Sequence, residues 1–340
     1  LRAEVVPWPQ NVVRGQNLAK IPGQTGWKEQ IREQFVMIRI LMLCLAAHLV
    51  AVMPAGAEEK RQTLGFGRLF SNDALGDGRD RWRTGAYTVS LLRGPKWDGD
   101  LPDRPLEIIE FQARADILAP ASLSRPAPGD RPYAGNLSFT GHTHWRQRET
   151  DVTVGAGVTL TGPMTGVSEL QRLIHEFMGI APPTGALNSQ IGNRVSPRIT
   201  AEAARRIPLA PGATLRPFLQ AETGAETLAR VGGEILVGAI WSDSLLLRDM
   251  ATGQLYTGVR GESTGLGLVL GADIARVADS IWLPSSRGLT LTEYRSRARA
   301  GLRWQGQKTS IFYGVTYLGP EFVGQTQGQF VGSMTFDIRF

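Results

Sequence analysis

The sequence predicts an all-β protein, a transmembrane antiparallel β-barrel of about 12 strands with one short helix in an extracellular loop. Segments of about ten residues alternate between apolar and polar side chains, and loops rich in Gly, Pro, Asp and Ser separate them. One segment carries a row of arginines on its polar face, and the last segment ends on an aromatic residue. About ten residues is the length of a tilted strand that crosses a bilayer.

The N-terminal region, residues 1–57, is expected to lie outside the mature protein. From Met37 the chain has one arginine, an apolar run over residues 40–53 and the small residues Ala55-Gly56-Ala57. This pattern is typical of a secretory signal peptide over residues 37–57, because the apolar run is shorter than the roughly 20 residues of a membrane-spanning helix. Residues 1–36 lack periodicity and are interpreted as an upstream extension, which leaves residues 58–340 for the barrel.

Charge and cysteine content exclude several classes of function. Residues 1–57 hold six of the 37 Lys and Arg and three of the 31 Asp and Glu, so the rest has a net charge of about +3 and gives no case for nucleic acid. The single cysteine, Cys44, lies in the predicted signal peptide, so the exported chain has no disulfide and no cysteine nucleophile. The histidines left to act as a base are His142, His144 and His175.

Alternation is clearest between residues 290 and 305, where four arginines share one face and Tyr294, Leu302 and Trp304 share the other. Unpaired charge is too costly to face a dry core. We therefore expect the arginines to face a solvated lumen, where acids on other strands, such as Glu110, Glu202 and Glu222, balance their charge. The alternative is an anion channel. The predicted strands lie near residues 63–73, 83–92, 105–118, 133–146, 150–161, 187–206, 212–223, 228–241, 262–276, 290–305, 308–319 and 328–340.

An even number of strands suits a closed barrel with both termini on the periplasmic side. The last predicted strand alternates Phe330, Met334, Phe336 and Phe340 with polar residues, and the chain stops at Phe340. This ending resembles the assembly signal of bacterial outer-membrane barrels. It favours a barrel in the outer membrane over the alternative, a soluble β-sandwich.

One helix is predicted in the mature chain, over residues 167–179. Its apolar residues form one arc on a 3.6-residue wheel, and we expect this apolar side to lie on the barrel. Gln171 and His175 are four apart, so they stack at the seam between the apolar and the wet face. Ser168 with Gln171 predicts a capping box, and Gly179 predicts the end. A histidine at the rim of the buried face indicates a site.

Four segments have the character of motifs. They are Phe70-Ser71-Asn72-Asp73, then Asp80-Arg81-Trp82-Arg83-Thr84-Gly85, then Arg131-Pro132-Tyr133-Ala134-Gly135, and finally the helix with Gln171 and His175 followed by Gly179, Gly185 and Gln190. In this order, and across residues 62–340, they resemble the outer-membrane lipid A 3′-O-deacylases. The resemblance implies calcium-dependent hydrolysis of the ester-linked acyloxyacyl group at the 3′ position of lipid A.

The resemblance also implies a role for each matching residue. A hard cation held by oxygen ligands can stabilise the oxyanion that forms on an ester carbonyl, and an imidazole can take a proton from water near neutral pH. We expect lipopolysaccharide as substrate, contact with outer-membrane lipids, and a monomer. The implied site has His175 as general base, Gln171 and Thr84 as further catalytic residues, Asn72 and Asp73 as Ca²⁺ ligands, and Asp80, Arg131 and Tyr133 as supporting residues.

Two positions depart from the family pattern. Ala181 stands where the family has a glutamate, six residues after the catalytic histidine, and Gly185-Ala186-Leu187-Asn188 lacks an expected aromatic. Either another acid supports the cation and the base, or the activity is reduced or redirected. The candidate acids are Asp77, Asp80 and Glu176, of which Glu176 points away from His175 on the helical wheel.

Other functions stay open. His142 and His144 are two apart on one strand face and could bind a metal if a third ligand were near. A barrel phospholipase or esterase would need a serine beside the histidine, and the sequence has no Gly-x-Ser-x-Gly motif. A non-enzymatic barrel, either a small porin or a degenerate relative, is the third possibility. Chelation should abolish hydrolysis by a calcium enzyme and spare a serine enzyme.

Overall fold

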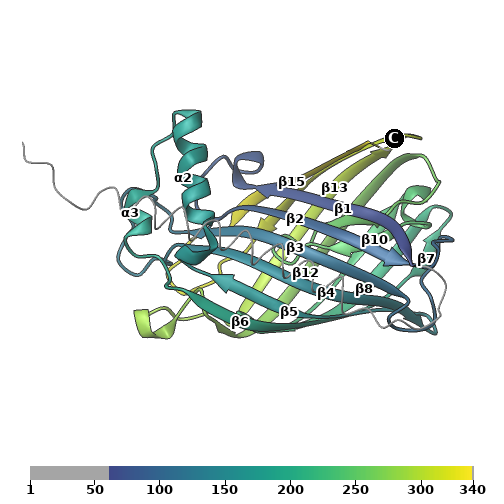
Figure 1. Cartoon of the computed structure of the whole chain (residues 1–340), viewed down its shortest axis with the longest axis horizontal. Helices are drawn as coiled ribbons and strands as arrows, with labels where there is room; N and C mark the ends of the chain where they lie inside the picture. The colour runs from purple at the N-terminus through teal and green to yellow at the C-terminus, as the bar shows by residue number, and fades with distance from the viewer. Residues whose placement is uncertain (1–60, 339–340) are drawn as a thin grey trace, which may run out of the picture. The chain divides into compact units, whose positions relative to one another are not determined.

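The computed structural model describes residues 61–338, so the predicted extension, the signal peptide and Phe340 lie outside the described residues. Within that range, twelve antiparallel strands form a ring, which β6 and β8 close by pairing with each other (Figure 1). The predicted twelve-stranded barrel is confirmed. The ring consists of β1 (Gln62–Asn72), β2 (Trp82–Gly94), β3 (Ile108–Ala119), β4 (Ala134–Gln147), β5 (Thr150–Thr161), β6 (Arg194–Arg205), β8 (Ala213–Thr223), β9 (Glu226–Val237), β12 (Gly265–Ser280), β13 (Tyr294–Gln305), β14 (Thr309–Leu318) and β15 (Gln329–Ile338).

Most strands begin and end within a few residues of their predicted bounds. The exception is the strand predicted from residue 187, because β6 begins only at Arg194. Before it, Thr184–Leu187 form the short helix α3, and the amide of Ile191 then donates to the carbonyl of Tyr133. A short strand, β7 (Ile207–Ala210), pairs with β8 at the edge of the ring.

The arginine row of β13 points into the lumen, as predicted, but its arginines are buried, and Arg295, Arg297 and Arg299 are ion-paired rather than solvated. Arg297 and Arg299 both pair with Asp273 on β12, and Arg299 also pairs with Glu234 on β9. Buried guanidinium groups need such partners because desolvation is otherwise too costly. The acids named from the sequence contact other side chains: Glu110 lies beside His142 and His144, Glu202 pairs with Arg216 and Arg248, and Glu222 pairs with Arg198.

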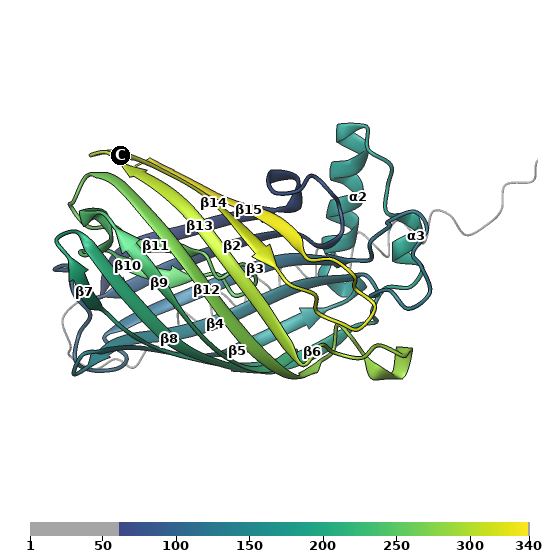
Figure 2. The same ribbon diagram turned by 180° about the vertical axis from the view of Figure 1, so that it is seen from behind.

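A hairpin lies inside the ring, at the end where β15 finishes (Figure 2). Its strands are β10 (Leu245–Arg248) and β11 (Leu255–Val259), which follow the short helix η3 (Ala239–Trp241). The leucines of β10, together with Leu255 and Tyr256 of β11, are buried against inward side chains of the ring such as Leu69, Leu92 and Phe312. At the tip, Arg248 pairs with Glu202 and Asp249 with Arg114. The hairpin therefore fills the lumen over part of its length.

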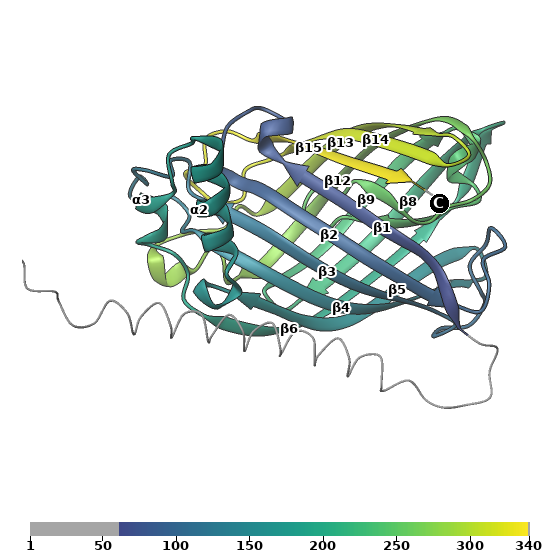
Figure 3. The ribbon, with the colours of Figure 1, turned by 45° about the horizontal axis from the view of Figure 1, so that its top comes forward.

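The longest connection, residues 162–193, lies at the opposite end and carries η2 (Pro163–Thr165), α2 (Val167–Met178) and α3 (Figure 3). Two further short helices, η1 (Asp73–Leu75) and η4 (Ser285–Arg287), lie in the β1–β2 and β12–β13 connections. Barrels of this kind have their longer loops outside the cell, so we assign this end to the extracellular side. None of the helices within residues 61–338 is long and apolar enough to span a membrane.

Candidate active site

Helix α2 turns its polar seam, and not its apolar arc, toward the barrel. Its buried residues are Val167, Gln171 and His175. Val167 lies on Gly135 at the start of β4, where an added Cβ would come within 2.9 Å of the Val167 Cβ. The predicted orientation, with the apolar side on the barrel, is therefore wrong. The apolar residues Leu170, Leu173, Ile174 and Phe177 are exposed instead.

The ends of α2 are only partly as predicted. The capping box of Ser168 and Gln171 is wrong, because Gly166 is the N-cap and no side chain caps this end. The Gln171 amide is occupied instead by Tyr133 and His175. Gly179 ends the helix in the left-handed conformation with φ 70°, which confirms the predicted C-terminus.

A chain of hydrogen bonds runs from the barrel to the histidine. The buried hydroxyl of Tyr133 donates to Oε1 of Gln171 at 2.8 Å, which turns the Gln171 Nε2 toward Nε2 of His175, 3.5 Å away. Burial, reinforced by the charge of Asp80, raises the pKa of Tyr133 above its usual value, so the phenol stays protonated and donates. Gln171 thus lies between a fixed phenol and the histidine ring.

The other ring nitrogen of His175 is held by the backbone. Nδ1 lies 2.9 Å from the carbonyl oxygen of Ala181. A carbonyl only accepts, so Nδ1 carries the proton and Nε2 of the neutral ring keeps its lone pair. Ala181 therefore orients His175 with its main chain. This tautomer is the one that a base acting through Nε2 requires.

Asp80 also lies next to Nε2 of His175. Its Oδ2 is 3.2 Å from Nε2 of His175. Burial raises the pKa of Asp80, and the nearby His175 partly offsets the rise. Of the other two candidate acids, Asp77 pairs with Arg81 and Glu176 pairs with Arg172. The structure therefore brings only one of the three, Asp80, to the histidine.

Asp73 and Asn72 lie where β1 ends, in the same loop as Asp80. Asn72 Oδ1 accepts from the amide of Ala74 at 2.8 Å and caps η1, and Asp73 Oδ2 accepts from the amide of Arg81 at 2.9 Å. Burial raises the pKa of Asp73 to about 8, opposed by the Arg81 amide and reinforced by the charge of Asp80. Within residues 61–338, Asp73 forms no ion pair. A buried carboxyl that lacks a positive partner is suited to binding a cation.

The donor set can be tested against calcium. No group of three or more His, Cys, Asp and Glu side chains in the described part of the chain lies close enough to hold a metal ion. Calcium, however, takes many of its ligands from backbone carbonyls, amides and water. Asp73 and Asp80 provide two carboxyl groups that feel one another's charge, and Asn72 directly precedes Asp73 in the sequence. These hard oxygen donors fit a calcium ion.

Thr84 is less directly connected to this group. It lies in a β-bulge, where the pairing of β2 with β3 shifts between Arg83 and Gly85, and its hydroxyl donates to the Ile117 carbonyl at 3.4 Å. Its neighbour Gly85 pairs with Asn72, and an added Cβ there would come within 3.0 Å of the Asn72 amide nitrogen. Among the described residues, no hydrogen bond joins Thr84 to Gln171 or His175.

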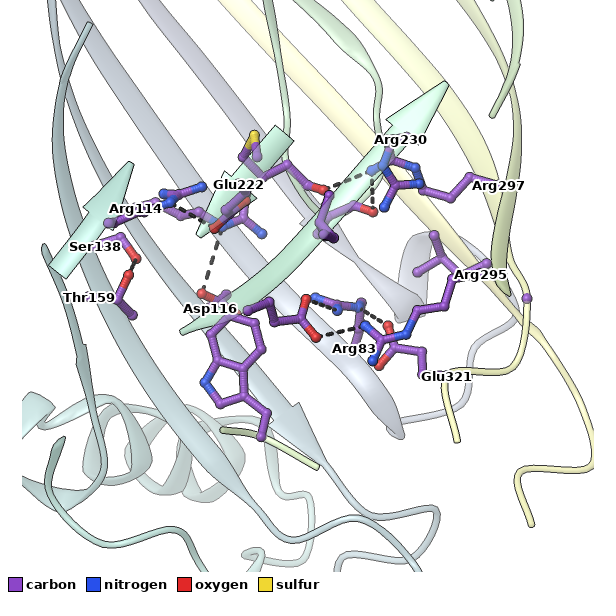
Figure 4. A pocket seen from close by; sticks show the side chains of 18 of the residues that line it. Arg83, Arg114, Asp116, Ser138, Thr159, Glu222, Arg230, Arg295, Arg297 and Glu321 are labelled. Atoms are coloured by element: carbon purple, nitrogen blue, oxygen red, sulfur yellow. Dashed lines mark hydrogen bonds and ion pairs between the residues drawn. The ribbon is translucent and has the colours of Figure 1, made fainter. Parts of the chain in front are cut away.

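Arg131 belongs to a chain of ion pairs. Its Nη1 donates to Oε2 of Glu321 at 2.6 Å, and Arg83 pairs with the other oxygen of Glu321. Arg83 also approaches Glu226, which pairs with Arg295 (Figure 4). Apart from Arg131, these side chains line a luminal cavity of about 50 Å³. Arg131 is itself a predicted supporting residue and Arg83 directly precedes Thr84, so this chain of ion pairs lies next to the predicted site residues in sequence.

Sequence reasoning missed Glu321 and Gln329. The Gln329 side chain accepts from the amide of Arg83 and donates to the carbonyl of Arg81, holding the chain on both sides of Trp82, which has a φ of 53°. Glu321 is 190 residues from Arg131, and no motif surrounds it. No spacing in the sequence could have indicated either contact. His142 and His144 both lie beside Glu110 in the lumen, far along β4 from Tyr133.

The sequence and the fold of the chain are similar to those of known outer-membrane proteins. The model of a family described as outer membrane protein LpxR matches residues 40–340. LpxR from Salmonella typhimurium has a similar solved structure, with a TM-score of 0.66 and 16% identity over 81% of this chain and 100% of that chain. The β domain of the Bordetella autotransporter BrkA has a TM-score of 0.37 and 11% identity, over 81% of this chain and 99% of that chain. This TM-score is too low to carry an argument. No curated protein matches the chain.

Proposed function

Because the chain belongs to the family of the outer membrane protein LpxR, we propose that it is a lipid A deacylase. It hydrolyses the ester that links the 3′ acyloxyacyl group to lipid A in the bacterial outer membrane. The observation that carries the proposal is the state of His175. Its Nδ1 is fixed by the Ala181 carbonyl, and its Nε2 faces Gln171 and Asp80, where it can take a proton.

His175 acts as the general base. Nε2 accepts a proton from the attacking water, and the imidazolium that forms is stabilised by the carboxylate of Asp80, 3.2 Å away. The same nitrogen then returns the proton to the sugar oxygen that leaves when the ester bond breaks. Tyr133 and Gln171 hold the ring in place through the hydrogen bonds described above.

A calcium ion is proposed as the electrophile. Asp73 and Asp80 would hold it, together with oxygen atoms of the Asn72–Asp73 segment. When bound, the ion supplies charge that stabilises the oxyanion of the ester carbonyl. Asp73 forms no ion pair within residues 61–338, and it feels the charge of Asp80, which supports this assignment.

The alternative functions receive less support. A porin needs an open lumen, whereas the β10–β11 hairpin fills it and its tip is ion-paired to the wall. A serine esterase needs a hydroxyl at the base, whereas within residues 61–338 the partners of His175 are Gln171, Asp80 and Ala181. A degenerate barrel that has lost turnover would keep the fold and release no acyl chain.

Mass spectrometry of lipid A tests the proposal. The chain is expressed in a bacterium whose lipid A carries an intact 3′ acyloxyacyl group, and lipid A is isolated from its membranes. We expect a loss of mass equal to that group. Unchanged lipid A, with the barrel folded in the outer membrane, would reject the proposed function.

A further inference from the structure

Within residues 61–338, helix α2 leaves a large apolar surface without a protein partner. Phe177 has 92% of its surface exposed, and Leu170, Leu173 and Ile174 are each about half exposed. We call these four residues the lipid face of α2. Single exposed apolar side chains are ordinary, but four on one side of one short helix form a contiguous patch of the kind that contacts a partner or a membrane.

The helix has three faces rather than two. At 100° per residue, the barrel face (Val167, Gln171 and His175), the charged face (Glu169, Arg172 and Glu176) and the lipid face are each about a third of a turn apart. Arg172 pairs with both glutamates, so the charged face is satisfied by itself and suited to water. A helix that meets protein, water and hydrocarbon on three sides lies at a membrane surface.

The neighbouring strands show which medium covers the lipid face. Phe70 on β1 and Tyr87 on β2 point outward, 41% and 46% exposed, near the ends of these strands that lead to the site. Outward aromatic residues near strand ends are typical of the girdle at the interface of outer-membrane barrels. The axis of α2 lies across the strands at this end (Figures 1 and 3). A helix so placed runs along the membrane surface and continues the apolar outer wall.

We infer that the lipid face of α2 docks on the fatty acyl chains of the outer leaflet, and that the helix is a membrane-immersed part of the barrel. Hydrocarbon covers Leu173 and Phe177, and water covers Arg172 and Glu176. One consequence rests on the proposed function: the same helix holds His175, so immersion brings the base to the depth where acyl chains join the headgroup.

Nitroxide scanning of the full chain tests this inference. Spin labels are attached to Leu173→Cys and Phe177→Cys, and to Glu169→Cys and Glu176→Cys as the matched charged-face controls, each with Cys44→Ser. The barrels are folded into palmitoyl-oleoyl-phosphatidylcholine vesicles, and heat-modifiable migration on gels verifies folding. Tyr87→Cys gives the reference for a lipid-facing label.

We expect labels at 173 and 177 to collide several-fold more often with oxygen, which concentrates in hydrocarbon, than with a water-soluble nickel chelate. Labels at 169 and 176 should show the reverse. Water-type accessibility at 173 and 177 would overturn the inference, as would dipolar broadening between labels at 177, which would mean that a second copy covers this face. The readout does not require hydrolysis, so its failure is distinct from failure of the proposed function.

Discussion

Nε2 of His175 and Oδ2 of Asp80 lie 3.2 Å apart, joining helix α2 to the connection between β1 and β2. The two residues come from loops that are far apart in sequence. Position 181 is alanine, and the acid beside the base is Asp80. This relationship is the basis for the first prediction.

Asp80→Asn should lower the rate of deacylation by about ten- to a hundredfold, because the amide cannot stabilise the imidazolium and is a weaker calcium ligand. Asp77→Asn is the matched control, since Asp77 lies in the same loop but pairs with Arg81. Release of the 3′ acyl group is followed by mass spectrometry over time. Equal losses in the two variants would contradict the role given to Asp80.

Tyr133→Phe should reduce kcat by up to about tenfold and leave KM nearly unchanged, because a hydrogen bond of about 1 kcal/mol that fixes Gln171 is lost while the ring still fills its site. Tyr87→Phe is the control, since Tyr87 faces outward on β2. Initial rates at several substrate concentrations separate the two parameters. A Tyr133→Phe variant as fast as the unmodified chain would show that the hydrogen bond from Tyr133 does not position Gln171 for catalysis.

Calcium removal should abolish hydrolysis, and calcium should raise the midpoint temperature of unfolding, because an ion that binds only the folded barrel stabilises it. Asp73→Asn should lose both effects, since Asp73 is the buried carboxyl of the proposed site. Asp77→Asn should keep them. Circular dichroism melts with calcium and with a chelator give the shift, and an unchanged shift in Asp73→Asn would remove Asp73 from the ligand set.

The intact barrel should conduct no steady current in a planar bilayer, because the β10–β11 hairpin fills the lumen. Replacing residues 244–260 with a short Gly-Ser linker should open a conducting path in those barrels that still show heat-modifiable folding. Single-channel recording compares the intact barrel with the barrel in which residues 244–260 are replaced. Stable channels from the unaltered chain would favour the porin alternative over a sealed enzyme.

Most of the barrel could be predicted from the sequence, because the alternation of apolar and polar residues along each strand indicates which side chains face the lumen and which face outward. In β13 the predicted faces of Arg295 and Trp304 are both correct. The hairpin could not be predicted in this way. Leu245–Arg248 and Leu255–Val259 are buried on all sides, so they show no alternation, and their burial depends on a ring that closes around them.

The site could be predicted in part. Gln171 and His175 share a side of one helix because they are four residues apart, and the structure adds Tyr133 and Asp80 to them. The orientation of α2 could not be predicted from its amphipathic pattern, because that pattern does not say whether the apolar side meets protein or lipid. Contacts such as that of Arg131 with Glu321 depend on closure of the barrel, which local patterns do not encode.

The central claim is that His175 performs the chemistry, and its most direct test is the rate at which purified, folded barrels release the 3′ acyloxyacyl group from lipid A in detergent micelles with calcium present. Replacing the base, His175→Ala, should lower this rate by about a hundred- to ten-thousandfold while the barrel keeps its heat-modifiable migration. Release at an unchanged rate from the folded His175→Ala barrel would contradict the account.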